Sequence, residues 1–271
     1  MLVTEKNKLS MSDIRTEIDR VDTALLDLIA ERMELAQAVR RAKSGVDVWR
    51  PSREESHVRH LAELAKGTSP DLVSHIWAEL TSASLSLQGP ICLHIGLVGD
   101  PMANGKMVRD RFGASIPIKN YPTASHALAA AHADAEGVAI LPAPGGMNNW
   151  WTALNPTGAA SNMNILAALP RIGNWSWPTA VAVSKAARLP SGSDQTLIYV
   201  EAGDLGPVQS PQKVFESVDL TARLRAEMKS HTLYSIPQYI SDEDESIADL
   251  KRQFKTVKII GVLPNPIKVS S

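Results

Sequence analysis

The chain has 271 residues, and its 28 lysines and arginines against 29 aspartates and glutamates give a formal net charge of −1. This balance, without a basic run that could follow a phosphate backbone, argues against a nucleic-acid partner. Hydrophobic residues make up 44% of a length sufficient for two modest domains, and no window is apolar enough to span a membrane. Residues 1–9 are polar and lack a secretion signal, so we expect a disordered tail on a cytoplasmic protein.

The single cysteine, Cys92, excludes an internal disulfide and fits a reducing compartment. Because it lies in an apolar run, we expect it in a core rather than as a nucleophile. No metal-ligand spacing links the seven histidines, so the sequence predicts no metal site. These histidines are His57, His60, His75, His94, His126, His132 and His231.

A stripe of apolar residues at helical spacing predicts one long helix over residues 10–43. Ser10 and Asp13 resemble a capping box at its start, and Gly45 suits the turn that ends it. The stripe consists of Ile14, Ile18, Val21, Leu25, Leu28, Leu35 and Val39.

Arg32 interrupts this stripe, and Lys43 falls on it four residues beyond Val39. A desolvated guanidinium requires an anionic partner, which is either a buried carboxylate of the protein or a bound anion. Arg32 and Lys43 lie roughly 16 Å apart along a helix, so their side chains can converge on one small anion. Arg15 lies about 25 Å before Arg32 and could reach that anion only from an antiparallel second copy. The spacing therefore favours a polar site built across a homodimer.

Two further helices are predicted over residues 52–66 and 70–88. Ser52 with Glu55 resembles a second capping box, and Ser69 before Pro70 starts the other helix. Polar residues lie on or beside the inner faces of these helices, and each also has a purely structural interpretation. Glu54 suits the positive end of a helix dipole, Arg53 a solvated face, and Ser84 a helix contact, while Gln88 ends the third helix.

The order, spacing and residue types of these three helices resemble the all-helical chorismate mutase family over residues 10–90. In that family the domain is an intertwined homodimer of three-helix chains, which agrees with the distance argument for Arg15. The resemblance rests on Ile14-Arg15 through Ile18-Asp19 and Asp22, on Glu31-Arg32 with Leu35-Ala36, and on Lys43, Arg53-Glu54 and Gln88.

The resemblance implies that Arg15 of one subunit and Arg32 of the other bind the two carboxylates of chorismate. Lys43 and Gln88 would donate hydrogen bonds to its ether oxygen, and Glu54 would hold its ring hydroxyl. The reaction is an intramolecular rearrangement to prephenate without a covalent intermediate, so the implied site needs shape and fixed charge, and neither a metal nor a cofactor.

Three more residues complete the implied site. Arg53 and Ser84 would support carboxylate binding, and Arg50 stands where bifunctional relatives often carry Asp, which adds positive charge at the mouth. The implied catalytic residues are Lys43, Gln88, Glu54 and Arg32. The implied substrate-binding residues are Arg15, Arg32, Lys43, Arg50, Arg53, Glu54, Ser84 and Gln88.

Beyond Pro90 short β-rich runs alternate with helical segments, which predicts an α/β or α+β region. Strands are expected at 91–98, 116–120, 138–141, 165–169, 180–184 and 196–201, with helices at 104–112 and 123–135. Residues 91–190 resemble a shortened, degenerate prephenate dehydratase. Pro142 leads into Ala143 where that family has Pro-Ile-Glu-Asn, and Thr179-Ala180-Val181 replaces its Thr-Arg-Phe. Dehydratase activity is therefore not expected.

Residues 191–271 resemble an ACT-type regulatory domain, with a helix expected at 211–229, a strand at 232–239, a helix at 242–254 and a strand at 257–263. The closing pattern Lys258-Ile259-Ile260-Gly261-Val262-Leu263-Pro264 carries this resemblance. The effector motifs of such domains, Gly-Ala-Leu and Glu-Ser-Arg-Pro, are absent, which favours a structural or dimerising role.

The sequence leaves three functions open. The first is a chorismate mutase with a structural or regulatory C-terminal half. The second is an isochorismate-pyruvate lyase of the same helical fold, which would use much the same cations. The third is a non-catalytic partner of an aromatic-pathway enzyme, against which the intact set of Arg15, Arg32, Lys43, Glu54 and Gln88 argues.

Overall fold

The computed structural model describes residues 10–42, 48–203 and 210–268. Its contacts divide the chain into two compact units, Met1–Gly45 and Val46–Ser271. The second and third helices thus belong to the same compact unit as the C-terminal sheet. The expected domain boundaries near residues 90 and 190 stay predictions. The expected disordered tail, residues 1–9, lies outside the described residues.

The first unit contains one helix, α1 (Met11–Ala42), as the apolar stripe predicts. Its start has the expected capping box, because the Asp13 backbone N–H donates to Ser10 Oγ at 3.2 Å and the Ser10 backbone N–H donates to Asp13 Oδ2 at 3.0 Å. The Ser10 hydroxyl, which donates to Asp13 Oδ2 at 2.7 Å, and the Ser10 backbone N–H lower the pKa of Asp13. Lys43 and Gly45 lie outside the described residues.

The second unit begins with a helical pair, α2 (Pro51–Leu64) and α3 (Pro70–Gln88). Ser69 caps α3 as expected, since its hydroxyl accepts from the Leu72 N–H at 3.2 Å. The capping box expected at Ser52 and Glu55 is wrong. The helix begins at Pro51, one residue earlier, and the Glu55 carboxylate instead binds arginines from other parts of the fold.

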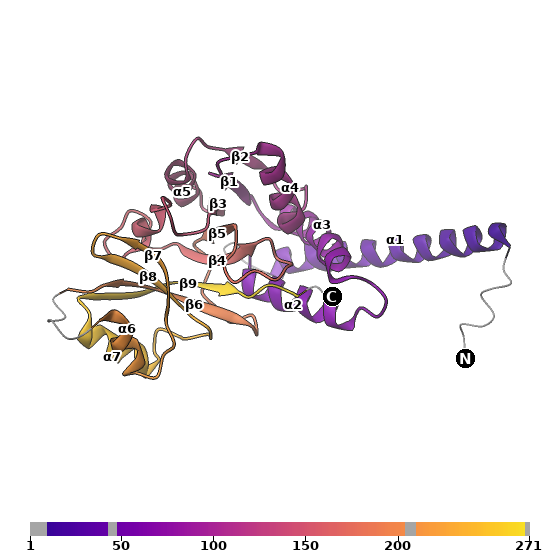
Figure 1. Ribbon diagram of the computed structural model, residues 1–271. Coiled ribbons are helices and arrows are strands. Elements are labelled where there is room, and N and C mark those ends of the chain that lie inside the picture. Colours follow the sequence, from indigo (N-terminus) through magenta and orange to yellow (C-terminus); the bar gives the residue numbers. More distant parts are fainter. Residues whose placement is uncertain (1–9, 43–47, 204–209, 269–271) are drawn as a thin grey trace. The chain divides into compact units, whose positions relative to one another are not determined.

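A nine-stranded sheet of order β2-β1-β3-β5-β4-β9-β6-β8-β7 forms the rest of this unit (Figure 1). Its first half is mixed, because β2, β1 and β3 are parallel while β5 is antiparallel to both β3 and β4. The strands are β1 (Cys92–Ile95), β2 (Ile118–Asn120), β3 (Gly137–Pro142), β4 (Asn164–Leu169) and β5 (Ala180–Ser184), and the helices are α4 (Pro101–Phe112), α5 (Ala124–Ala133) and the short η2 (Trp150–Leu154).

The second half of the sheet has the element order strand, helix, strand, strand, helix, strand. Its antiparallel strands lie in the order β9-β6-β8-β7, a split βαβ arrangement. The elements are β6 (Asp194–Glu201), α6 (Pro211–Glu216), β7 (Arg223–Met228), β8 (His231–Ile236), α7 (Glu245–Gln253) and β9 (Thr256–Pro264). A parallel pairing of Ile165 with Gly261 joins the two halves.

The single long helix expected over 211–229 is wrong. The helix ends at Glu216, Asp219 has a positive φ of 56°, and β7 follows as an edge strand. The residues of β7 favour helices individually, but pairing with β8 and burial of Ala226 override that preference.

Apolar side chains cover both faces of the sheet. In the first half, α5 covers one face, and the other packs against Val108 and Phe112 of α4 and Leu85 of α3. In the second half, α6 and α7 lie together on one face, as Figure 1 also shows, and pack against Ile198 and Ile259. The buried Cys92 confirms the expectation that it lies in a core.

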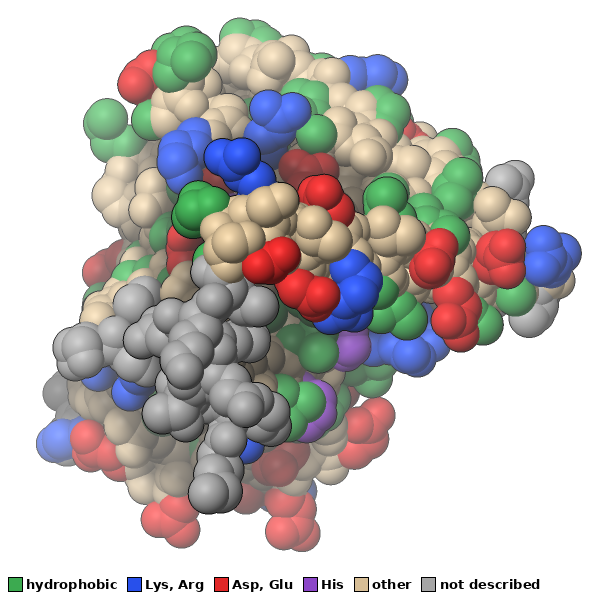
Figure 2. Space-filling model, turned by 90° about the vertical axis from the view of Figure 1, so that its right-hand side faces the viewer, with side chains coloured by type: hydrophobic (Ala, Val, Ile, Leu, Met, Phe, Trp, Pro, Cys, Tyr) green, Lys and Arg blue, Asp and Glu red, His purple; other side chains and the backbone are tan. Residues whose placement is uncertain are grey.

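Among the described residues, no helix combines the length and apolar character needed to cross a lipid bilayer. On the face drawn in Figure 2, acidic and basic side chains are interspersed. This distribution agrees with the near-zero net charge of the sequence.

Candidate functional site

Two of the residues assigned to chorismate lie on α1. Arg15 is exposed, and Arg32 is half-buried, with a pKa lowered by its burial. The seven apolar residues of the α1 stripe are between 37% and 61% exposed. A continuous apolar surface of this kind is typical of a face that binds a partner.

The remaining predicted residues lie near the ends of α2 and α3. Arg50 is the exposed N-cap residue of α2, and Arg53 is exposed in its first turn. Ser84 is buried, and its hydroxyl donates to the Leu80 carbonyl at 2.7 Å, a bond within α3. Gln88 is half-buried as the last residue of α3.

Glu54 lies in a buried ionic cluster that the sequence did not predict. Its Oε1 accepts hydrogen bonds from Arg111, at the end of α4, and from Arg171, which follows β4. Its Oε2 accepts from the Trp49 indole N–H at 3.0 Å. The side chains of Arg111 and Arg171 are only 1% and 2% exposed, so these charges are removed from water.

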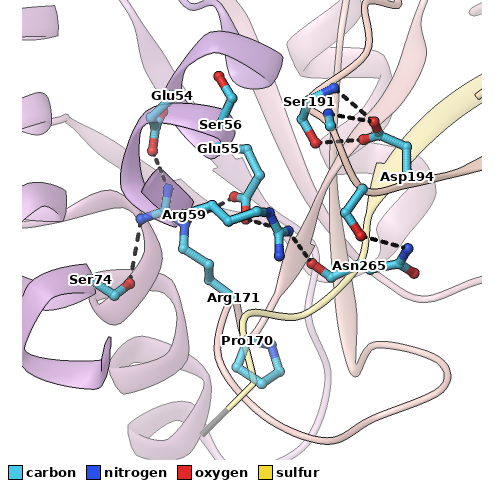
Figure 3. A network of polar contacts seen from close by, with 12 residues as sticks. Glu54, Glu55, Ser56, Arg59, Ser74, Pro170, Arg171, Ser191, Asp194 and Asn265 are labelled. Carbon is cyan, nitrogen blue, oxygen red and sulfur yellow. Dashed lines mark hydrogen bonds and ion pairs between the residues drawn. The ribbon is translucent and has the colours of Figure 1, made fainter. Parts of the chain in front are cut away.

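Glu55 extends the same cluster (Figure 3). Its Oε2 accepts from Arg171 Nε at 3.1 Å and lies 3.8 Å from Arg111 Nη2. Arg171 also donates to Ser74 Oγ at 3.4 Å, and Arg59 lies 3.5 Å from Glu55 Oε1 while donating to the Asn265 carbonyl at 2.6 Å. The cluster therefore joins α2, α3, α4, the end of β4 and the segment after β9.

Opposite effects act on the Glu54 carboxyl. Burial raises its pKa, but the charges of Arg111 and Arg171 and the hydrogen bonds from Trp49 and Arg111 outweigh burial and lower it below the ordinary value. Glu54 is therefore ionised at neutral pH. An ionised carboxylate offers about four acceptor positions, of which these neighbours use three.

The donors of the cluster outnumber its acceptors. Within the described residues, Nε and Nη2 of Arg111 and Nε of Arg59 are buried without a hydrogen-bond acceptor. Removing one carboxylate would therefore leave the buried guanidinium groups with still fewer acceptors and an uncompensated positive charge.

Comparison with known proteins identifies the family of the helical segment. Residues 14–89 match the model of the chorismate mutase type II family, so this segment of the chain is a chorismate mutase type II domain. The match begins on α1 and ends just after α3, and it confirms the resemblance drawn from the sequence.

Two curated relatives are similar to part of the chain. The bifunctional chorismate mutase/prephenate dehydratase of Neisseria gonorrhoeae is 30% identical over 117 residues, which are 42% of this chain and 29% of that protein. The T-protein of Enterobacter agglomerans is 40% identical over 70 residues, 24% of this chain and 19% of that protein. The aligned region thus spans less than a third of the length of these relatives.

A solved structure resembles a larger part of the chain. Prephenate dehydratase from Arthrobacter aurescens, in complex with L-Phe, gives a TM-score of 0.45 at 14% identity, covering 65% of this chain and 90% of that one.

Proposed function

We propose that the chain is a chorismate mutase that rearranges chorismate to prephenate. The observation that carries the proposal is the chorismate mutase type II match over residues 14–89, which contains every residue that the resemblance assigns to substrate. The two carboxylates of chorismate would bind Arg15 of one copy and Arg32 of the other, because Arg15 lies about 25 Å before Arg32 on one helix.

The exposed stripe of α1 supports a homodimer. Burying its seven side chains against a second copy would remove their exposed apolar surface from water, and each Å² removed stabilises the complex by roughly 25 cal/mol. An antiparallel copy brings Arg15 of one chain toward Arg32 of the other.

Glu54 can serve the ring hydroxyl of chorismate within its cluster. Its lowered pKa keeps it an acceptor at neutral pH, and one of its acceptor positions is free of the three donors that the structure places on it. Arg111 and Arg171 would then hold the carboxylate in place while it binds.

Catalysis would come from donors aimed at the ether oxygen. Negative charge builds on that oxygen as its bond to carbon breaks, so Lys43 and Gln88 would stabilise the transition state more than the substrate, by about 3 to 4 kcal/mol for a comparable donor. Binding the compact dianion in a reactive conformer would supply the remaining part of the rate enhancement.

We also propose that the chain lacks prephenate dehydratase activity. Ala180, which stands where the dehydratase motif has Arg, is fully buried on β5 and pairs with Pro142 of β3. The C-terminal sheet would then have a structural or regulatory role.

One experiment tests these proposals together. Purified protein is given chorismate, isochorismate or prephenate in separate samples, and the products are followed by NMR. We expect prephenate from chorismate, no salicylate and pyruvate from isochorismate, and no phenylpyruvate from prephenate. Salicylate and pyruvate would instead identify the lyase, and no turnover of any substrate would identify a non-catalytic partner.

Gln88 provides a pH test of the mechanism. In Gln88→Glu the new carboxyl can donate to the ether oxygen only when protonated, so we expect activity that rises as the pH falls toward about 4, where glutamate gains its proton. The matched control is Gln238→Glu, an exposed position after β8. Initial rates of chorismate loss are measured across the pH range for both variants. If Gln88→Glu follows the wild-type pH profile as Gln238→Glu does, Gln88 is not a donor to the ether oxygen.

A further inference from the structure

A second group of reactive side chains lies on the opposite face of the sheet from α4, beneath α5. Cys92 and His94 are two residues apart on β1 and therefore point to the same face. They are only 7% and 2% exposed, and Asp134 at the end of α5 lies above them. The Cys92 sulfur, one ring nitrogen of His94 and a carboxylate oxygen of Asp134 all lie within 4.8 Å of one another.

We propose that Cys92, His94 and Asp134 form a binding site for a thiophilic divalent cation, zinc in particular. The three ligand atoms are already close to the arrangement that a tetrahedral ion requires, in which Zn–S is about 2.3 Å and Zn–N about 2.0 Å. Closing the group around an ion needs shifts on the order of 1 Å.

The backbone around Asp134 is built for this close approach. Asp134 faces β1 because the end of α5 packs directly on Gly137, the residue of β3 paired with Cys92. A Cβ atom at position 137 would lie 2.8 Å from the Ala131 Cα and 2.9 Å from the Asp134 Cβ. Any larger residue there would push the carboxylate away from the strand.

The hydrogen bonds of His94 orient it as a ligand. Its Nδ1 lies 2.9 Å from the Tyr121 hydroxyl, and its Nε2 lies 3.2 Å from Asp134 Oδ2. Metal-binding histidines usually engage a second group through the other ring nitrogen, which fixes the tautomer and the ring orientation. Tyr121 can play that part, which leaves Nε2 to exchange its bond with Asp134 for a shared ion.

Cys92 has no comparable partner. The hydrogen bond described for its thiol is a 3.9 Å approach to the carbonyl of Leu93, which is weak, and the charges of Lys119 and Asp134 also act on the sulfur. The sulfur is therefore available to an ion within a group whose other members already contact one another.

Charge and donor type select the kind of ion. A thiolate and a carboxylate carry two negative charges, so a divalent cation balances the charge of its ligands and offsets the cost of burying the thiolate. Sulfur and nitrogen donors disfavour magnesium and calcium and suit zinc or cobalt. The Asp134 side chain is 29% exposed, so water can reach a fourth position on the ion.

Cobalt titration of the tag-free chain tests the site, because thiolate-bound Co²⁺ absorbs in the near ultraviolet. Cys92 is the only cysteine, so any such band must come from it. After chelator treatment we expect the band to saturate at one equivalent of Co²⁺ and to disappear when Zn²⁺ is added. No band at saturating Co²⁺ would overturn the proposal.

Two acid-to-amide variants separate ligation from a general charge effect. Asp134→Asn removes a ligand, whereas Glu136→Gln removes the same charge two residues further on. We expect Asp134→Asn to weaken Zn²⁺ binding at least tenfold and Glu136→Gln to bind as wild type, while Tyr121→Phe, which keeps all three ligands, weakens binding by about tenfold. Equal affinities for Asp134→Asn and Glu136→Gln, with the fold verified by circular dichroism, would remove Asp134 from the site and refute it.

Discussion

Arg171→Met destabilises the second unit by about 3 to 5 kcal/mol, because two buried carboxylates, Glu54 and Glu55, each lose a guanidinium partner. Arg171 is 2% exposed and binds both Glu54 and Glu55, whose side chains are 9% and 3% exposed. Methionine fills a similar volume without a charge, so the loss reports on electrostatics more than on packing. Urea unfolding followed by tryptophan fluorescence measures it, since all six tryptophans belong to this unit.

The control is Arg252→Met, which removes an ion pair with Asp249 on the surface of α7. Those side chains are 76% and 43% exposed, and such pairs contribute little to stability. We expect the urea midpoint of Arg252→Met to be close to that of the wild type. A double variant, Glu54→Gln with Arg171→Met, should recover part of the loss because a neutral amide loses less than a carboxylate when a guanidinium partner is removed. If Arg171→Met lowers the free energy of unfolding no more than Arg252→Met does, the cluster is not a source of stability.

The same cluster should make stability depend on pH. The folded-state pKa of Glu54 is lowered, so its contribution is present above the ordinary carboxyl pKa of about 4.3 and is lost as the pH falls through the folded value. Arg171→Met removes one cause of that lowering. The stability difference between wild type and Arg171→Met should therefore narrow below about pH 4.

The sequence predicted the parts of this fold that depend on local pattern. The spacing of seven apolar residues predicted α1, and short apolar runs predicted the positions of β1 to β5. It failed at β7, where residues with helix preference are held in a strand by pairing with β8. That pairing is set by the sheet and not by the strand's own composition.

The polar clusters could not be predicted for a related reason. Arg111 and Arg171 lie 57 and 117 positions after Glu54, and Asp134 lies 40 after His94. No spacing rule links residues so far apart. Only Cys92 and His94, two apart on a predicted strand, carried a local signal that their side chains share a face. The residues assigned to chorismate follow from helical spacing and from the family resemblance over residues 14–89, and their roles stay predictions.

Lys43→Ala lowers turnover of chorismate by about two to three orders of magnitude if Lys43 is a donor to the ether oxygen. The cause would be the loss of a charged donor where negative charge develops, so kcat falls more than KM rises. Lys43 follows α1 in the sequence and lies outside the described residues, so the effect is predicted from the helical spacing and the family match. Initial rates of chorismate loss measure it, and near-normal turnover would remove Lys43 from the mechanism.

Mixing two inactive variants decides whether the site is shared between copies. If each site takes Arg15 from one subunit and Lys43 from the other, a heterodimer of Arg15→Ala and Lys43→Ala has one fully intact site. Random association makes half of the dimers mixed, so co-refolded protein should regain about a quarter of wild-type activity. Arg32→Ala mixed with Lys43→Ala is the matched control, because these two residues would serve the same site from one subunit and no intact site can form. Recovery in both mixtures, or in neither, would contradict a site that draws Arg15 from one chain and both Arg32 and Lys43 from the other.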